Sequence, residues 1–203
     1  MISESHLQRI KVLIASEMGW EFGQSRNSDL QRALVALAVE NGVSKNSGAI
    51  HRWLDSVQWS VREFEFLARH LTVGETYFFR EKPHLDFFRK TIIPEIIASR
   101  QHSNPTIRIW SAGCCTGEEP YSLAMLLWES VPDISRWKVT ILATDVNQTY
   151  LDKASKGLFS AWSFRETPEA IRQRYFIQKG NQWQILPEIR TMVTFMRLNL
   201  ATG

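Results

Sequence analysis

Two apolar segments, each followed by a helical pattern, constrain the fold of this chain more than any other feature. Residues 107–112 and 138–145 are short, rich in β-branched side chains and bounded by polar positions, as buried strands are. Helical patterns follow them over 118–129 and 148–156. This strand–helix–strand–helix order predicts a parallel sheet with crossover helices, and residues 193–200 have the pattern of its third main strand.

The first half of the chain shows helical spacing instead. Over residues 1–103 we predict several short helices and no strand: one capped near Ser28, one over 61–70 and one over 83–100. Pro94 lies inside the last of these and favours a kink, because proline has no backbone N–H to donate. The sequence therefore predicts an all-helical N-terminal domain that ends near residue 103.

A hairpin is predicted inside the second domain, which spans residues 104–203. Gly180 and Asn181 lie between two apolar stretches, and this pair favours a tight turn. We therefore expect a β-hairpin subdomain at about 176–194.

The composition excludes several classes of protein. Hydrophobic residues make up 44% of the 203 residues, which is enough for a core. The 24 basic and 21 acidic side chains give a net charge of +3, and neither half is strongly basic, so we expect no nucleic-acid partner. No apolar run reaches the length of a membrane span, and the N-terminus lacks the order of a secretory signal. We therefore expect a cytoplasmic protein without direct membrane insertion.

The two cysteines, Cys114 and Cys115, are adjacent. A disulfide between neighbours strains the peptide that joins them, and no Cys or His spacing suggests zinc. We expect small buried thiols and no metal site.

A glycine turn follows the first predicted strand. Gly113 and Gly117 have Gly-x-x-x-Gly spacing, which is neither a dinucleotide nor a Walker motif, and Glu118 and Glu119 come next. Two acids at a helix start suit the helix dipole but would repel a pyrophosphate, so the turn suits a nucleoside that carries a positive centre better than NAD or ATP. The spacing alone leaves two interpretations open: a tight strand-to-helix turn, or a ligand site at the sheet edge.

The second predicted strand ends in Asp145. A carboxylate there typically accepts hydrogen bonds from ribose hydroxyls, whereas the alternative is an N-cap of the next helix. The neighbouring glycine turn favours the ribose.

A third element is the aromatic segment Gly74-Glu-Thr-Tyr-Phe-Phe-Arg-Glu81. Its aromatic residues suit core packing, and Arg80 suits a surface ion pair. Alternatively, Arg80 binds an anion such as a carboxylate, because arginine keeps its charge and offers a fork of donors.

In this order and spacing, the three elements resemble the chemotaxis receptor methyltransferase family, CheR. The resemblance is carried by residues 76–81, 108–122 and 137–145, with shorter matches at 157–159, 174–176, 193–195 and 199–200. It implies an α/β fold class: an N-terminal all-helical domain, then a Rossmann-like parallel sheet of the class I methyltransferase type, incomplete in this chain, with a small antiparallel β insertion.

The resemblance also implies site residues. They are Thr76, Arg80, Gly113, Glu119, Asp145, Asn199 and Leu200, with Arg80 also the catalytic residue. The cofactor is S-adenosyl-L-methionine, and its product is S-adenosyl-L-homocysteine. Asp145 would bind the ribose, Glu119 the methionine or ribose part, and Asn199 with Leu200 would flank the adenine.

The implied activity is protein-glutamate O-methylation. The partner would be the cytoplasmic helices of a chemoreceptor-like protein, and the enzyme would be recruited to membrane receptor arrays.

Three departures from the family pattern leave alternatives open. Gly74 stands where the family usually has Asn, and around residues 30–43 only Arg32 is positive in a helix that is basic in the family. The family's Arg-Asn-x-x-Ile-Tyr-Phe motif does not occur. We therefore expect a truncated part with an exposed strand edge and little activity alone. The alternatives are a methyltransferase with a different acceptor, or a non-catalytic fragment that binds cofactor or a partner.

Overall fold

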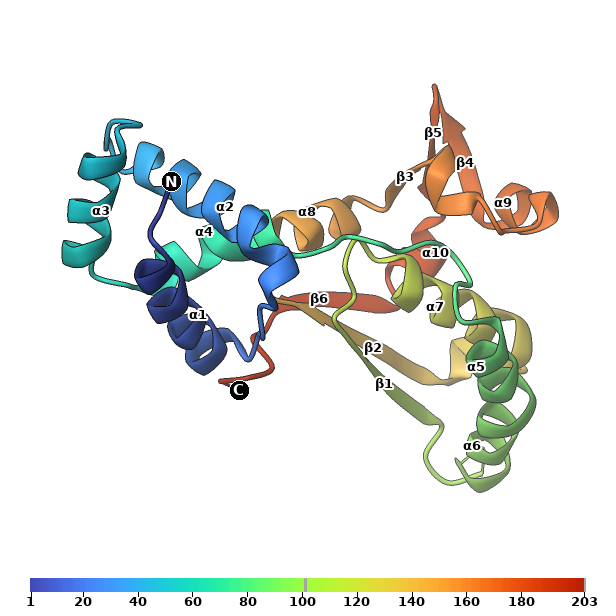
Figure 1. Cartoon of the computed structure of the whole chain (residues 1–203). Helices are drawn as coiled ribbons and strands as arrows, with labels where there is room; N and C mark the ends of the chain where they lie inside the picture. The colour runs from blue at the N-terminus through green and yellow to red at the C-terminus, as the bar shows by residue number, and fades with distance from the viewer. Residues whose placement is uncertain (101, 203) are drawn as a thin grey trace. The chain divides into compact units, whose positions relative to one another are not determined.

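The computed structural model describes residues 1–100 and 102–202, whose contacts form two compact units (Figure 1). The helical unit consists of Met1–Val73, Val146–Gln148 and the residues from Leu198 on. The sheet unit consists of Gly74–Asp145 and Thr149–Arg197. Among the described residues, no helix is both long and apolar enough to cross a bilayer.

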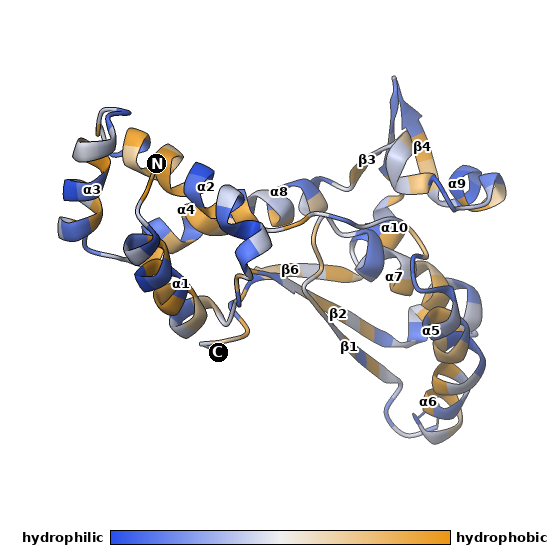
Figure 2. Ribbon diagram, in the orientation of Figure 1, coloured by the Kyte–Doolittle hydropathy of each residue, from blue (hydrophilic) through white to orange (hydrophobic). Residues whose placement is uncertain are grey.

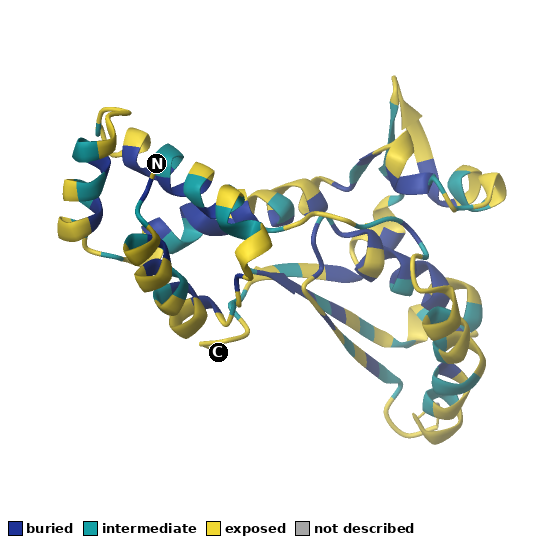
Figure 3. Ribbon diagram, in the orientation of Figure 1, coloured by how far each residue is buried: buried dark blue, intermediate teal, exposed yellow. Residues whose placement is uncertain are grey.

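The helical unit is built from amphipathic helices around one core. They are α1 (Glu4–Met18), the 3-10 turn η1 (Gln24–Arg26), α2 (Asn27–Glu40), α3 (Ser47–Ser56) and α4 (Val61–Leu71). One face of α2 is apolar and buried, as Figures 2 and 3 show; its buried residues are Leu30, Ala33, Leu34, Leu37 and Ala38. The predicted cap is displaced, because α2 begins at Asn27 and Ser28 lies inside its first turn. Ser60 caps α4 through a reciprocal capping box with Glu63.

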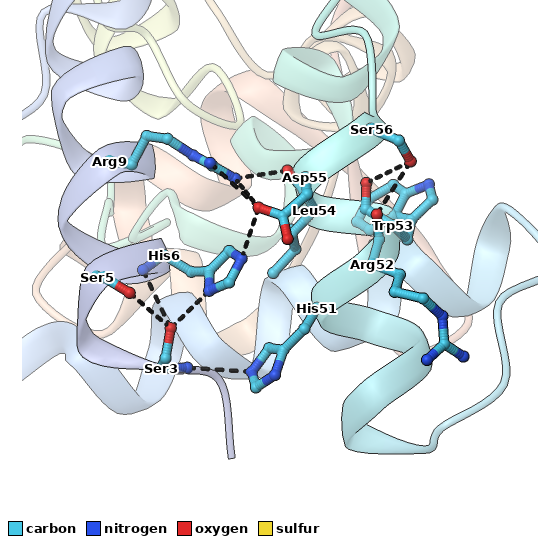
Figure 4. A network of polar contacts seen from close by, with 10 residues as sticks. All are labelled: Ser3, Ser5, His6, Arg9, His51, Arg52, Trp53, Leu54, Asp55 and Ser56. Atoms are coloured by element: carbon cyan, nitrogen blue, oxygen red, sulfur yellow. Dashed lines mark hydrogen bonds and ion pairs between the residues drawn. The ribbon is translucent and has the colours of Figure 1, made fainter.

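A polar network joins α1 to α3 (Figure 4). The ring of His6 lies between Ser3, the N-cap of α1, and the carboxylate of Asp55, with Nε2 3.0 Å from Oδ1. Arg9 donates to the same carboxylate and to the carbonyl of Leu54. His6 also stacks on His51. The first helix, which is not among the predicted ones, is thus held by this network as well as by its buried residues Leu7, Ile10, Ile14 and Met18.

The main sheet of the sheet unit is parallel, as predicted. Its order is β1 (Thr106–Ala112), β2 (Lys138–Asp145) and β6 (Val193–Arg197). Helices α7 (Glu118–Ser130) and α8 (Gln148–Lys156) follow the first two strands, with the 3-10 turn η3 (Ile134–Arg136) before β2. Together with the helices and a second, antiparallel sheet, this topology confirms the predicted α/β fold class.

The two faces of the main sheet differ in burial, and Figure 3 shows the alternation along β1 and β2. Ile107, Ile141 and Ala143 lie on the face that packs into the core. Trp110 and Met196 lie on the opposite, exposed face. Within the described residues, β1 pairs only with β2 and forms an edge of the sheet.

The helix predicted over 83–100 forms as α5 (Lys82–Phe87), a π-helical turn η2 (Phe88–Ile92) and α6 (Ile93–Arg100). Pro94 explains the wide turn, because it cannot donate to the residue four positions earlier, and Ile93 N–H bonds to Phe88 O instead. These helices belong to the sheet unit, since Ile93 is buried in the core that covers the sheet. The contacts thus divide the chain after Val73, whereas the sequence pattern changes near residue 103.

The small antiparallel sheet has the order β3–β5–β4. Its strands are β3 (Leu158–Ser160), β4 (Phe176–Lys179) and β5 (Gln182–Ile185), with η4 (Ala161–Phe164) and α9 (Glu169–Tyr175) between the first two and α10 (Pro187–Arg190) after the last. Gly180 turns the predicted hairpin with φ +61°. Residues 193–194, included in the predicted subdomain, belong to β6 of the main sheet, and β3 supplies the third strand instead.

We expect the α1–α3 network to weaken in acid. The contact with His6, assisted by Arg9, holds the pKa of the Asp55 carboxyl below its usual value of 3.8. A lowered folded-state pKa adds stability above the unfolded-state pKa, and that stability is lost as the pH falls through the folded-state pKa. Asp55→Asn should therefore unfold at a lower temperature than the native chain at pH 5, and this gap should close toward pH 2. Circular dichroism melts test this, and a gap that stays constant with pH would contradict it.

Candidate active site

The two glycines of the turn after β1 have different roles. Both have positive φ, +73° at Gly113 and +96° at Gly117, where glycine is strongly favoured. A Cβ at Gly117 would lie 2.9 Å from the Cβ of Ala154, so Gly117 allows close packing of the turn on α8. A Cβ at Gly113 would meet nothing within 4 Å. Gly113 is therefore the position where the backbone faces open space that a ligand can approach.

Two carboxylates lie beside this turn because β1 and β2 end in register, with Ala112 opposite Thr144. Asp145 is buried, and its Oδ2 accepts the Cys115 N–H at 2.9 Å. Glu119 is exposed, and the Ser111 hydroxyl donates to its Oε1 at 2.6 Å. The turn thus presents negative charge, which fits a cationic nucleoside and not a pyrophosphate.

Glu118 differs from its neighbour because its side chain is buried, with 3% exposed. Its carboxylate accepts hydroxyl hydrogen bonds from Thr116 at 2.6 Å and from Ser163 at 2.8 Å. A buried carboxylate is tolerated when hydrogen bonds replace its water. Glu118 therefore connects the glycine turn to the segment after β3.

The aromatic segment, residues 74–81, reaches the same helix. The Phe79 N–H donates to the Ser122 hydroxyl at 3.0 Å, and that hydroxyl donates to the Glu118 carbonyl at 2.7 Å. Phe79 has φ +59°, a costly conformation for an aromatic residue that persists where the surroundings impose it. One hydrogen bond therefore joins this segment to α7, and a second, within α7, fixes the hydroxyl that accepts it.

The contacts of the aromatic segment support core packing and a surface ion pair, and the binding of an anion by Arg80 stays a prediction. Phe78 is fully buried among other phenyl rings, as core packing predicts. The exposed Arg80 donates to the Glu75 carbonyl at 2.6 Å and lies 3.7 Å from a carboxylate oxygen of Glu81. The half-buried Thr76 accepts a 3.3 Å hydrogen bond from Arg165 at its carbonyl.

The unusual Gly74 has a steric reason. A Cβ there would lie 2.7 Å from the Tyr150 hydroxyl and 2.9 Å from Cζ of the same ring. Gly74 therefore leaves room for an aromatic side chain.

The adjacent thiols are buried, as predicted. Burial raises the pKa of Cys115 to about 11 and that of Cys114 to about 12, so both stay protonated at neutral pH and are poor nucleophiles. Among the described residues, no group of three or more His, Cys, Asp or Glu side chains could hold a metal ion.

The last two predicted site residues belong to the helical unit. The Asn199 amide donates to the Glu17 carbonyl at 2.6 Å, and its oxygen accepts the Ala201 N–H. Leu200 is exposed. Their place beside adenine stays a prediction.

Sequence reasoning missed the hydroxyls of Ser122 and Ser163, and it related Glu118 to the helix dipole without foreseeing its buried contacts. Neither serine has a distinctive local spacing, and Ser163 lies 45 positions from Glu118. Only the Thr116-Gly-Glu118 order hinted that the first acid could turn back toward the glycine turn.

Comparison with known proteins agrees with this geometry. Residues 74–202 match the family model described as CheR methyltransferase, SAM binding domain. The chain is 30% identical to a chemotaxis protein methyltransferase of Borreliella burgdorferi over 98% of its own length and 71% of the relative. It is 37% identical to one of Listeria innocua over 94% and 69%, respectively. It is 36% identical to chemotaxis protein methyltransferase 2 of Vibrio cholerae over 70% of its own length and 49% of that relative.

The family match begins at Gly74, the residue at which the sheet unit begins. It includes the glycine turn, both neighbouring carboxylates and the aromatic segment. The chain belongs to the CheR methyltransferase family, and its residues 74–202 match the family's S-adenosylmethionine-binding domain.

Proposed function

We propose that this chain transfers methyl groups from S-adenosylmethionine to glutamate side chains of chemoreceptor-type proteins. The observation that carries the proposal is the juxtaposition of three features: open space at Gly113, the carboxylates of Glu119 and Asp145, and a hydrogen-bonded link to the segment of Arg80. Each feature matches a requirement of binding a cationic nucleoside next to an anionic acceptor. The substrates place the proposed activity in the cytoplasm, at receptor arrays.

The proposed cofactor contacts follow the chemistry of the groups present. Asp145 accepts hydrogen bonds from the ribose hydroxyls, and Glu119 binds the methionine or ribose part. Gly113 allows close backbone approach. Thr76, Asn199 and Leu200 complete the proposed contacts, the last two at the adenine.

Bound S-adenosylmethionine supplies an electrophilic methyl group on a sulfonium centre. The acceptor glutamate is ionised at neutral pH, so the chain need not supply a general base. Its task is to align two reactants and to exclude water. Arg80 holds the acceptor carboxylate, since its guanidinium keeps its charge and donates in a fork.

A groove between α2 and α4 supports a protein acceptor. It has a volume of about 960 Å³ and combines apolar with basic side chains. Among its lining residues are Val35, Ala36, Val39 and Phe66, and also Arg32, Lys45, Arg69 and His70. Glu40 lines it as well, 4.0 Å from Arg69, so basic side chains remain in excess. The sequence of α2 alone offered only Arg32, whereas the fold adds basic residues from α4 and from the loop after α2. An amphipathic helix with acidic residues is complementary to such a groove.

We expect Asp145→Asn to weaken cofactor binding. The change removes a charge-assisted contact worth about 1.5–3 kcal/mol, so the Kd for S-adenosylhomocysteine should rise roughly 10–100-fold in calorimetry. Asp133→Asn is a matched control, because Asp133 lies in the loop before β2 with φ +48°, which Asn tolerates. Equal affinities for both variants would refute the assignment of Asp145.

Arg80→Ala should separate transfer from binding. We expect kcat for methylation of a receptor cytoplasmic fragment to fall by about 10²-fold, because the acceptor carboxylate loses its alignment. Affinity for S-adenosylhomocysteine should stay nearly unchanged. Arg89→Ala, an exposed arginine of η2, provides the control. Unchanged turnover in Arg80→Ala would remove Arg80 from the mechanism.

Reversing charge in the groove should weaken binding of the acceptor protein without changing binding of the cofactor. In a Lys45→Glu, Arg69→Glu double variant we expect KM for the receptor fragment to rise about tenfold, less so at high salt, with cofactor affinity preserved. Arg52→Glu reverses an exposed charge on α3 as a control. Methylation of small carboxylic acids but not of the receptor fragment would favour a different acceptor.

A further inference from the structure

The aromatic segment depends on residues 160–167 for its position. Residues 72–77 form no regular secondary structure, so no strand or helix ladder holds them. The Phe78 N–H donates to the Ser163 carbonyl at 2.9 Å, and the Thr167 hydroxyl donates to the Phe78 carbonyl at 3.3 Å. The Phe78 ring stacks on Phe164 with centroids 4.9 Å apart.

One side chain from this region, Arg165, contacts three consecutive residues of the aromatic segment. Its Nη1 donates to the Thr76 carbonyl at 3.3 Å, and its Nη2 donates to the Glu75 carboxylate at 2.5 Å. Its guanidinium carbon lies 3.9 Å from the centroid of the Tyr77 ring and 4.4 Å from that of Trp162. Nη1 also donates to the Trp162 carbonyl at 2.9 Å.

These contacts need arginine. Two aromatic rings contact the planar group while its two terminal nitrogens donate in different directions, and the side chain is only 19% exposed. A lysine ammonium is a compact point charge without the planar fork, so it cannot keep the stacking and all of these hydrogen bonds together.

We infer that Arg165 is a positioning residue for methyl transfer. It fixes Thr76 and, through the backbone that follows, the direction in which the Arg80 side chain extends. The inference rests on the proposed function for the roles of Thr76 and Arg80. Phe79 adds a reason for the strong hold, because its φ of +59° is costly and must be imposed by neighbours. Without Arg165, fewer contacts hold the residues before Phe78. The backbone from which the Arg80 side chain extends is then less fixed, and so is the guanidinium.

The chain offers a matched control in Arg172. Its guanidinium lies 4.4 Å from the Trp183 centroid and pairs with Glu169. Arg172 is thus an arginine stacked on a tryptophan in the same unit. Its guanidinium also lies 5.8 Å from the Phe164 centroid, but among the described residues it forms no hydrogen bond, ion pair or ring contact with residues 74–81.

The test compares Arg165→Leu, Arg165→Lys and Arg172→Leu. In Arg165→Leu we expect faster amide hydrogen exchange at Phe78 and Phe79, unchanged exchange within α7, and a fall of about 10²-fold in kcat for methylation of a receptor fragment. In Arg165→Lys we expect the slow exchange at Phe78 and Phe79 and the kcat to be partly recovered. In Arg172→Leu we expect both quantities to match those of the native chain.

Faster exchange throughout the sheet unit, or equal effects of Arg165→Leu and Arg172→Leu, would overturn the inference and leave Arg165 a general stabilising residue. So would normal kcat in Arg165→Leu. Absence of transfer by the native chain would count against the proposed function alone, because the exchange measurement needs no turnover. Localised exchange at Phe78 and Phe79 would then still support Arg165 as the residue that places the segment.

Discussion

The arrangement of the sheet unit depends on one buried carboxylate, that of Glu118. Its side chain accepts hydroxyl groups from the glycine turn and from the segment after β3, while its backbone carbonyl accepts the hydroxyl that receives the Phe79 N–H. The removal of a carboxylate from water is expensive unless such donors replace the water. Parts of the chain that are distant in sequence are therefore fixed to the start of one helix, and the candidate site lies where they meet.

In this arrangement the two neighbouring acids differ in burial and in role. Glu118 is buried and serves the structure, whereas Glu119 is exposed at the same helix start and is available to a ligand. The two glycines differ in a similar way, since Gly117 allows close packing on α8 whereas Gly113 faces open space. A motif that reads as one unit in the sequence thus contains both buried, structural positions and open ones, because the chain turns there from a strand into a helix.

The sequence predicts well those features that depend on local periodicity. The parallel strands, the helices after them, the hairpin at Gly180 and the burial of the thiols all follow from spacing and turn chemistry. It predicts poorly those features that depend on distant partners. Arg165 and Ser163 reach the site through contacts with residues far away in sequence, and α1 is attached to α3 by a histidine–aspartate contact that no local pattern announces. The division after Val73 likewise follows from the packing of Ile93, since α5 and α6 look like any other helices.

The space next to Gly74 has an evolutionary consequence. The ring of Tyr150 occupies the volume in which a side chain at position 74 would lie. A family member with a larger residue at this position must shift the tyrosine or replace it with something smaller. The two positions are therefore expected to vary together, and substitutions at either one alone should be rare among close relatives of this chain.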